Sequence, residues 1–140
     1  MYKPTTICYT VVMNTKQQGD IGVAKAIYVY TALGYIVSIP NTDNSKYDLI
    51  IDNGSLYRVQ VKTTTYKTHY GVYQVMLKTS GGNQSWSGII GRIDQNNVDV
   101  VAILSEDGSF YHYPAEVLNG RTTVNLGKDA EKYKVELDRW

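Results

Sequence analysis

The sequence predicts one α/β or α+β domain, residues 1–140, built around a mixed central β-sheet flanked by helices. One long helical pattern near the N-terminus precedes several short strand-like segments and then mixed short elements, the order typical of helices packed on one sheet. The length of 140 residues is that of a single domain. The 13 Tyr against a single Phe favour half-buried sheet faces, because tyrosine keeps a polar end on an aromatic body.

The helix is predicted from Lys16 to Leu33, where apolar residues recur at steps of three and four and Gly34 follows as a stop signal. Strands are predicted at seven short apolar or alternating runs: Tyr35–Ile39, Tyr47–Asp52, Leu56–Thr65, Tyr70–Leu77, Val98–Leu104, Ser109–Tyr113 and Thr122–Leu126. The run from Val98 is apolar except at Asp99, which indicates a strand buried on both faces. We expect a surface loop over Ser80–Gly91, a short helix over Pro114–Leu118 and a peripheral C-terminal remainder.

Composition excludes several classes of protein. The net charge of +1 is not that of a polybasic protein, so charge alone does not indicate nucleic acid. Cys8 is the single cysteine, which excludes an internal disulfide framework and favours a reducing cytoplasm, that of the host if a phage encodes the protein. No signal peptide and no apolar run near the ~20 residues of a membrane span are present, so we expect a cytoplasmic protein without a membrane partner. No Cys pair, phosphate-binding glycine loop or nucleophile elbow occurs.

Candidate chemistry lies on the third predicted strand, where side chains alternate between two faces. One face carries Tyr57, Val59, Val61 and Thr63, and the other carries Arg58, Gln60 and Lys62. The turn at Asn53-Gly54 decides which residue of the preceding strand lies beside them. A two-residue turn would place Asp48 on the wrong face, whereas a three-residue turn pairs Asp52 with Leu56 and brings Asp48 opposite Gln60. We predict the three-residue turn.

In that register a carboxylate, an amide oxygen and a lysine converge, a set suited to hydrolysis of phosphodiester bonds. Mg²⁺ takes oxygen ligands and keeps several waters beside one or two carboxylates, so Asp48, Gln60 and the Val61 carbonyl are the candidate ligands. Lys62 would orient or deprotonate the attacking water. Taken as spacing alone, this pattern is more commonly a set of exposed polar groups on a solvated sheet face.

A resemblance adds to this argument and runs from about Thr15 to Val135. The segments that carry it are Gly19–Gly22, Ala24–Ile27, Gly34–Pro40, Tyr47–Asp52, Tyr57–Thr64, Thr79–Asn83, Val98-Asp99 and Tyr133–Val135. With these segments the chain resembles the PD-(D/E)XK nucleases, and within them the intron-associated homing endonucleases. The resemblance implies a restriction-endonuclease-like fold, cleavage of double-stranded DNA with Mg²⁺ or, as a substitute, Mn²⁺, and a homo-oligomer, either dimer or tetramer.

The same resemblance implies roles for individual residues. Asp48 matches the first motif carboxylate and Lys62 the motif lysine, while Gln60 stands where many relatives carry Glu. Relatives can place a further acid at the position of Val23, which cannot bind metal here, so Asp20 is the available acid. Asp20 also has a structural explanation, because an acid in the first turn of a helix is favoured by the helix dipole.

DNA contacts are predicted at six residues: Arg58, Lys67, Ser80, Gly82, Asn83 and Gln84. Asn and Gln amides can hydrogen-bond to adenine edges in the major groove. A solvated surface charge is the alternative for Arg58 and Lys67, and a plain connection is the alternative for the loop.

The leading hypothesis is therefore a site-specific, metal-dependent endonuclease of the homing type. A Holliday-junction resolvase or a restriction-type nuclease of the same fold is the first alternative. A DNA-binding module that has lost catalysis is the second, motivated by Gln60 and Val23 at positions where relatives carry acids.

Overall fold

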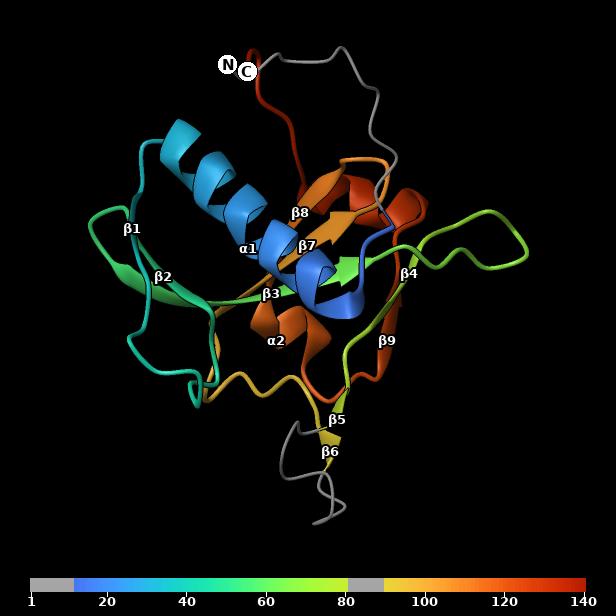
Figure 1. Ribbon diagram of the computed structural model, residues 1–140, viewed down its shortest axis with the longest axis horizontal. Coiled ribbons are helices and arrows are strands. Elements are labelled where there is room, and N and C mark those ends of the chain that lie inside the picture. The colour runs from blue at the N-terminus through green and yellow to red at the C-terminus, as the bar shows by residue number, and fades with distance from the viewer. Residues whose placement is uncertain (1–11, 81–89) are drawn as a thin grey trace, which may run out of the picture.

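The computed structural model describes residues 12–80 and 90–140 (Figure 1). Its elements, in chain order, are α1 (Thr15–Ala32), β1 (Ile36–Ser38), β2 (Leu49–Asp52), β3 (Leu56–Thr64), β4 (Gln74–Met76), β5 (Thr79–Ser80), β6 (Ile90–Gly91), β7 (Val100–Ser105), β8 (Phe110–Pro114), α2 (Ala115–Leu118), β9 (Thr123–Asn125), the 3-10 helix η2 (Lys128–Tyr133) and β10 (Lys134–Val135). Within the described ranges, no helix has the length and apolar character needed to cross a membrane.

A six-stranded mixed sheet forms the centre, with the order β1-β2-β3-β7-β8-β10. β3 and β7 run parallel, and the other neighbours are antiparallel. Two short pairs, β4 with β9 and β5 with β6, lie outside this sheet. The mixed central sheet is therefore confirmed, and its parallel pair places β3 between β2 and β7.

Helix α1 begins with a capping box in which the Asn14 side chain accepts a hydrogen bond from the Gln17 N–H, and the Gln17 side chain accepts one from the Asn14 N–H. This exchange satisfies two of the N–H groups that the first turn leaves without helical partners. The helix ends before Gly34, whose φ of 88° lies in the left-handed region that glycine adopts without strain. The predicted helix is confirmed to within a residue at each end.

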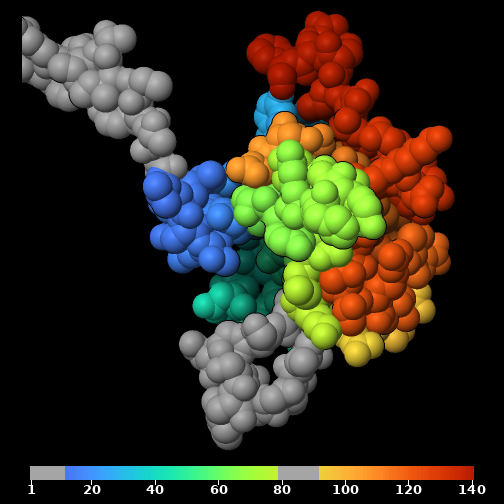
Figure 2. All heavy atoms as spheres, turned by 90° about the vertical axis from the view of Figure 1, so that its right-hand side faces the viewer, coloured from blue at the N-terminus to red at the C-terminus, as the bar shows by residue number. Residues whose placement is uncertain are grey.

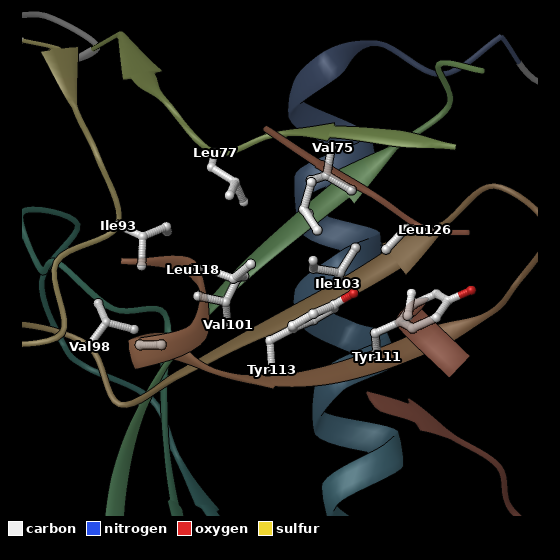
Figure 3. Packing of buried hydrophobic residues seen from close by; sticks show 13 residues of the cluster. Val75, Leu77, Ile93, Val98, Val101, Ile103, Tyr111, Tyr113, Leu118 and Leu126 are labelled. Carbon is white, nitrogen blue, oxygen red and sulfur yellow. The ribbon is translucent and has the colours of Figure 1, made fainter. Parts of the chain in front are cut away.

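The sheet separates two apolar layers. On one face α1 packs Ala26, Val29 and Tyr30 against Leu49, Ile51, Val59, Val100, Ala102 and Phe110. On the other face α2, β4, β9 and η2 cover β7 and β8, and Figure 3 shows this second layer, in which Leu77 and Leu118 approach Val101 and Tyr113. Because successive residues of β7 enter opposite layers, Val100–Ile103 are all buried, as the continuous apolar run predicts.

Gly22 allows α1 to lie close to β3. A Cβ at this position would collide with the Thr63 side chain and press against Val61 Cγ1 at 3.2 Å. Gly19, one turn earlier in the same helix, has nothing within 4 Å of its place for a Cβ. The absence of a side chain at Gly22 therefore sets the distance between the helix and the strand.

In the middle of the chain, one predicted strand and one predicted loop are each longer than the elements in the structure. The strand predicted over Tyr70–Leu77 is confined to Gln74–Met76, because Thr68–Gly71 forms a turn in which Gly71, at φ 78°, donates to the Thr68 carbonyl. The segment predicted as a surface loop over Ser80–Gly91 has paired ends, since Ser80 lies opposite Ile90. Residues 81–89 lie outside the described part of the chain.

The C-terminal remainder is not peripheral, contrary to the expectation. β10 pairs with β8 as an outer strand of the central sheet, and Ala130 of η2 is 1% exposed within the second apolar layer. The segment looks peripheral in sequence because charged residues surround Ala130 and Val135, which are the positions that face inward.

A polar contact links α1 to β8 inside the first layer. The Tyr30 hydroxyl lies 2.9 Å from His112 Nδ1, and burial lowers the pKa of His112 from its ordinary value of 6.5. Burial also raises the pKa of Tyr30, so its hydroxyl keeps its proton and forms this hydrogen bond with the neutral imidazole.

Gly22→Ala should lower the free energy of unfolding by about 1–3 kcal/mol, because the added methyl group overpacks the contact between α1 and β3. Gly19→Ala is the matched control and should raise the same quantity by up to about 1 kcal/mol, since alanine is the better helix former. Urea denaturation of the two variants measures both. Equal effects of the two substitutions would contradict the close packing at Gly22.

Stability should fall as the pH drops below 6.5, because the unfolded chain takes up a proton at His112 that the folded chain resists. The contribution is complete above the ordinary pKa and is lost as the pH falls toward the lowered one. His112→Gln should flatten this dependence in urea titrations between pH 7.5 and 5, while His69→Gln, which removes an exposed histidine, should leave it unchanged. A slope that His112→Gln does not alter would contradict the prediction.

Candidate active site

The turn between β2 and β3 has the predicted three-residue form. Asp52 pairs with Leu56 and Leu49 pairs with Val59, and the ladder ends there. Gly54 takes a φ of 109°, and its N–H donates to the Asp52 carboxylate at 2.8 Å. The predicted pairing of Asp52 with Leu56 is confirmed, and the charge of Asp48 acts on Lys62, while the predicted place of Asp48 opposite Gln60 stays a prediction.

Asp48 lies where the β2–β3 ladder ends. Its N–H donates to the Val59 carbonyl at 2.8 Å, and its Oδ2 accepts the Val61 N–H at 2.7 Å. The carboxylate thus takes the place of a strand partner at the edge of β3. This bond holds the side chain against β3 and leaves Oδ1 available for another partner.

Gln60 and Lys62 lie beside the buried residues of β7 that belong to the second apolar layer. Gln60 is paired with Val101 and Lys62 with Ile103, both fully buried, and residues paired in a sheet share a face. Burial lowers the pKa of the Lys62 ammonium from its ordinary value of 10.5, and the negative charge of Asp48 acts in the opposite direction but more weakly. Lys62 is therefore a cation held in an apolar setting with one acid nearby.

The oxygen atoms at this site fit a hard divalent cation. Asp48 supplies a carboxylate, Gln60 an amide oxygen and Val61 a backbone carbonyl, the ligand types that Mg²⁺ takes together with water. In residues 12–80 and 90–140, no three His, Cys, Asp or Glu side chains come together as a metal-binding group. A cation held here would take the Asp48 carboxylate together with the Gln60 and Val61 oxygens, and water or substrate would complete its shell.

Asp20 is held apart from these residues. It belongs to α1, which covers the opposite face of the sheet, and its carboxylate accepts a 3.0 Å hydrogen bond from Lys16 Nζ. The Asp20 side chain is 68% exposed. Its contribution to the metal site stays a prediction, one that requires α1 or the Asp20 side chain to move.

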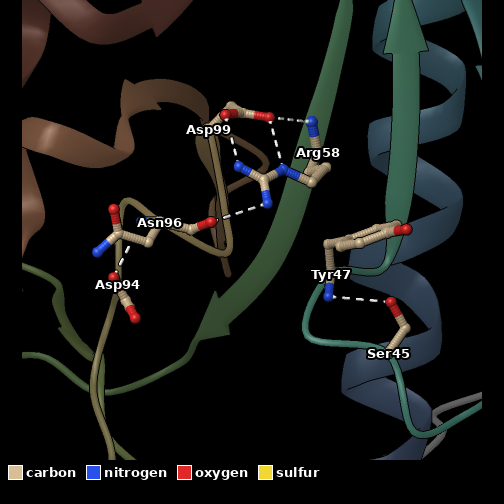
Figure 4. Close-up of polar contacts among 6 residues, drawn as sticks. All are labelled: Ser45, Tyr47, Arg58, Asp94, Asn96 and Asp99. Carbon is tan, nitrogen blue, oxygen red and sulfur yellow. Dashed lines mark hydrogen bonds and ion pairs between the residues drawn. The ribbon is translucent and has the colours of Figure 1, made fainter.

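Arg58 is bound on two sides by groups that precede β7 (Figure 4). Its Nε and Nη2 donate to the two oxygens of Asp99 at 3.0 Å, its own N–H donates to the same carboxylate at 2.7 Å, and Nη1 donates to the Asn96 carbonyl. The hydrogen bonds from Arg58 lower the pKa of Asp99, and those to Asp99 raise that of Arg58. Arg58 therefore joins β3 to the start of β7, and its predicted contact with DNA stays a prediction.

The other predicted DNA contacts are distributed over two segments. Lys67 is exposed in the hairpin after β3, and its Nζ lies 4.8 Å from the centre of the Tyr73 ring. Ser80 ends β5, while Gly82, Asn83 and Gln84 lie outside the described residues.

Sequence reasoning missed two features beside Asp48. The first is Asp99 as the partner of Arg58, signalled only by an acid at the start of a buried run. The second is a pocket of about 520 Å³ lined by the loop that leads into Asp48, by Arg58 and by Asn97. The Asn and Ser content of this loop, together with Lys46, was the available signal, since such side chains and lysine are common phosphate contacts.

Comparison with known proteins gives a family and two similar structures. The sequence model of a family described as PD-(D/E)XK endonuclease matches residues 13–136. The structure is similar to that of the bacterial homing endonuclease I-Ssp6803I, with a TM-score of 0.69 and 26% sequence identity over 91% of this chain and 82% of that one. It also shares the fold of Hjc, a Holliday junction resolvase of the archaeal hyperthermophile Archaeoglobus fulgidus, with a TM-score of 0.53 and 12% identity over 86% of this chain and 92% of that one. No curated protein matches.

Lys62→Met should raise the free energy of unfolding by on the order of 1 kcal/mol, because it removes a charge from an apolar setting while keeping a similar volume. The gain should be full at neutral pH and shrink as the pH rises toward 10.5, where the lysine loses its charge without cost. Lys128→Met, at an exposed lysine of η2, is the control and should change stability by less than about 0.5 kcal/mol. A Lys62→Met variant less stable than the parent in urea denaturation would contradict this account.

Proposed function

This chain belongs to the PD-(D/E)XK endonuclease family, and on that premise we propose that it is a metal-dependent, site-specific endonuclease that cuts double-stranded DNA. The observation that supports the proposal most strongly is the hydrogen bond from the Val61 N–H to the Asp48 carboxylate, which holds Asp48 against β3 near Lys62. A neighbouring register would move Asp48 to the other face of the sheet. A nuclease of this family needs these groups together.

The homing type is supported by the likeness to a bacterial homing endonuclease over most of both chains. A homing endonuclease recognises a long, rare target, which requires more protein surface than the three catalytic groups supply. Asn83 and Gln84 between β5 and β6, with Gly82 and Ser80, are proposed to contribute base and backbone contacts. Arg58 and Lys67 are proposed to contact phosphates on either side of the catalytic residues.

Mg²⁺, or Mn²⁺ in its place, is proposed to be held by Asp48, the Gln60 amide oxygen and the Val61 carbonyl, with Asp20 as a further ligand if it reaches the site. When bound, such a cation polarises the phosphate and lowers the pKa of a coordinated water. Asp48 also keeps the edge of β3 in place through the Val61 N–H. Lys62 orients the attacking water, and the low pKa that burial imposes makes its neutral amine more accessible as a proton acceptor.

Cleavage of both strands of a duplex requires two active sites in opposite orientations. One protomer carries one set of Asp48, Gln60 and Lys62. We therefore propose that the protein acts as a homo-oligomer, a dimer or a tetramer, in which two protomers each cut one strand.

A DNA-binding module without catalysis is the second candidate, and a specific observation favours it. Among the described residues, Asp48 is the carboxylate whose charge acts on Lys62, while Gln60 occupies the position of a second acid and Asp20 is paired with Lys16. A module of this kind would bind duplex DNA in a salt-sensitive manner and leave it intact with every divalent ion.

Incubation with a randomised-site plasmid library should give cuts that need Mg²⁺ or Mn²⁺, disappear with EDTA and cluster at one long motif when the ends are sequenced. Asp48→Ala and Lys62→Ala should each reduce cleavage by about 10²-fold or more, because each removes a group that acts on the reacting phosphate or water. Gln60→Glu should keep cleavage, since a carboxylate supplies the same oxygen. Asp138→Ala and Lys128→Ala, at exposed residues away from β3, are the controls.

Full cleavage by Asp48→Ala or Lys62→Ala would refute the assignment of the site. Cuts confined to branched DNA would favour resolution of junctions over homing. Binding without cuts, unchanged in the Gln60→Glu variant, would establish the non-catalytic module.

A further inference from the structure

Positive charge is concentrated in the middle third of the chain. Residues 53–93 contain Arg58, Lys62, Lys67, Lys78 and Arg92 and no Asp or Glu, although the whole chain has nearly equal numbers of cations and acids. This stretch includes β3, the hairpin of residues 65–73 and β4. Arg58 is bound by Asp99 and Lys62 lies near Asp48, whereas the hairpin of residues 65–73 carries Lys67 and contains no acid, so its charge is complementary to a polyanion.

The hairpin of residues 65–73 is an ordered projection at the end of β3. Lys67 and Tyr73 form an antiparallel bridge, the Thr68 N–H donates to the Val72 carbonyl at 2.8 Å, and the Gln74 N–H donates to the Tyr66 carbonyl at 3.0 Å. The turn closes at Gly71. Figure 1 shows the hairpin extending away from the body between β3 and β4, and in Figure 2 its light green spheres stand in front of the body.

The hairpin exposes aromatic side chains that its own backbone holds in place. Tyr66 is 61% exposed and Tyr70 is 82% exposed, and the ring of His69 lies 3.8 Å from that of Tyr70. An exposed ring keeps its apolar surface in water, so burial of Tyr66 and Tyr70 does not stabilise the folded chain. Tyr66, Tyr70 and Lys67 are exposed on a hairpin without acids, and side chains of these types can pack on sugars and donate to phosphates, since Lys and Tyr both contact the DNA backbone.

The hairpin also lies within reach of the substrate of the proposed active site. Tyr66 lies four positions after Lys62, at most about 13 Å along an extended chain. That length corresponds to about four base pairs of B-form DNA. A duplex that runs along β3 with its scissile phosphate at Lys62 would therefore reach the hairpin.

We propose that the hairpin of residues 65–73 is a second DNA-contacting element, in which Tyr66 and Tyr70 pack against the sugar–phosphate backbone beside the cleavage site and Lys67 pairs with a phosphate. The inference rests on the proposed function in that the partner is duplex DNA. It adds Tyr66 and Tyr70 to the residues proposed to contact DNA. Because these two residues would contact the sugar–phosphate backbone, they would contribute to binding of any base sequence.

The test measures binding of the full chain to a fluorescein-labelled random-sequence duplex by anisotropy, with Ca²⁺ in place of Mg²⁺ and over a series of salt concentrations. Lys67→Ala should weaken binding and reduce the slope of log K against log salt by about 0.9, the effect of losing one phosphate contact. Tyr66→Ser combined with Tyr70→Ser should weaken binding by about tenfold with little change in slope, because the rings carry no charge. Tyr66→Phe combined with Tyr70→Phe should keep most of the affinity.

Lys128→Ala is the matched control for a general loss of charge. Hairpin variants that bind as tightly as the parent, or that weaken binding no more than Lys128→Ala, would overturn the proposal while the parent's metal-dependent cutting left the proposed function standing. Sedimentation of the double serine variant completes the test. A smaller oligomer with unchanged affinity for DNA per protomer would show that the hairpin joins copies of the chain, and would also overturn the proposal.

Discussion

The turn at residues 53–55 fixes the pairing on which the proposed chemistry depends. Gly54 adopts the left-handed region, and the Asp52 carboxylate accepts its N–H, so the loop contains three residues. Because side chains alternate along a strand, a shift of one residue would exchange the two faces of β2. The shift would put Leu49 and Ile51 on the face of Lys62 and remove Asp48 from it, at the cost of the first apolar layer. The same burial that stabilises the sheet therefore holds the carboxylate in position.

One face of β3 packs against α1, and the other carries two of the proposed catalytic residues. On the α1 face, Val59, Val61 and Thr63 lie in a contact so close that Gly22 has no room for a side chain. On the opposite face, Gln60 and Lys62 lie next to Val101 and Ile103, two apolar residues of β7. A lysine placed there is unfavourable for folding, and an apolar residue would suit the position better. The role proposed for Lys62 in the reaction would account for a lysine at this position.

Local patterns in the sequence predicted much of this arrangement. The helix, the turn at Asn53-Gly54, the register and the buried run after Val98 all follow from residues close together in the chain. Contacts between distant residues were not predictable in the same way. Arg58 and Asp99 are 41 positions apart, and nothing near Arg58 indicates that an acid binds it. The pairing of β10 with β8 was missed for the same reason, because only the tertiary fold shows that Val135 faces inward.

The parallel pairing of β3 with β7 has a consequence for the order in which the protein assembles. The hairpins β2–β3 and β7–β8 each join neighbouring segments and can form early. The parallel pair β3–β7 must close a long loop, and the chain entropy lost in closing it opposes folding until the contacts of the pair have formed. Until that step, Lys62 lacks the apolar neighbour Ile103 that perturbs it, and Arg58 lacks Asp99. Nascent or partly folded chains would carry every proposed catalytic residue without the environment that tunes them. The pairing of β3 with β7 would then be the folding step after which the chain can carry out the proposed cleavage of DNA.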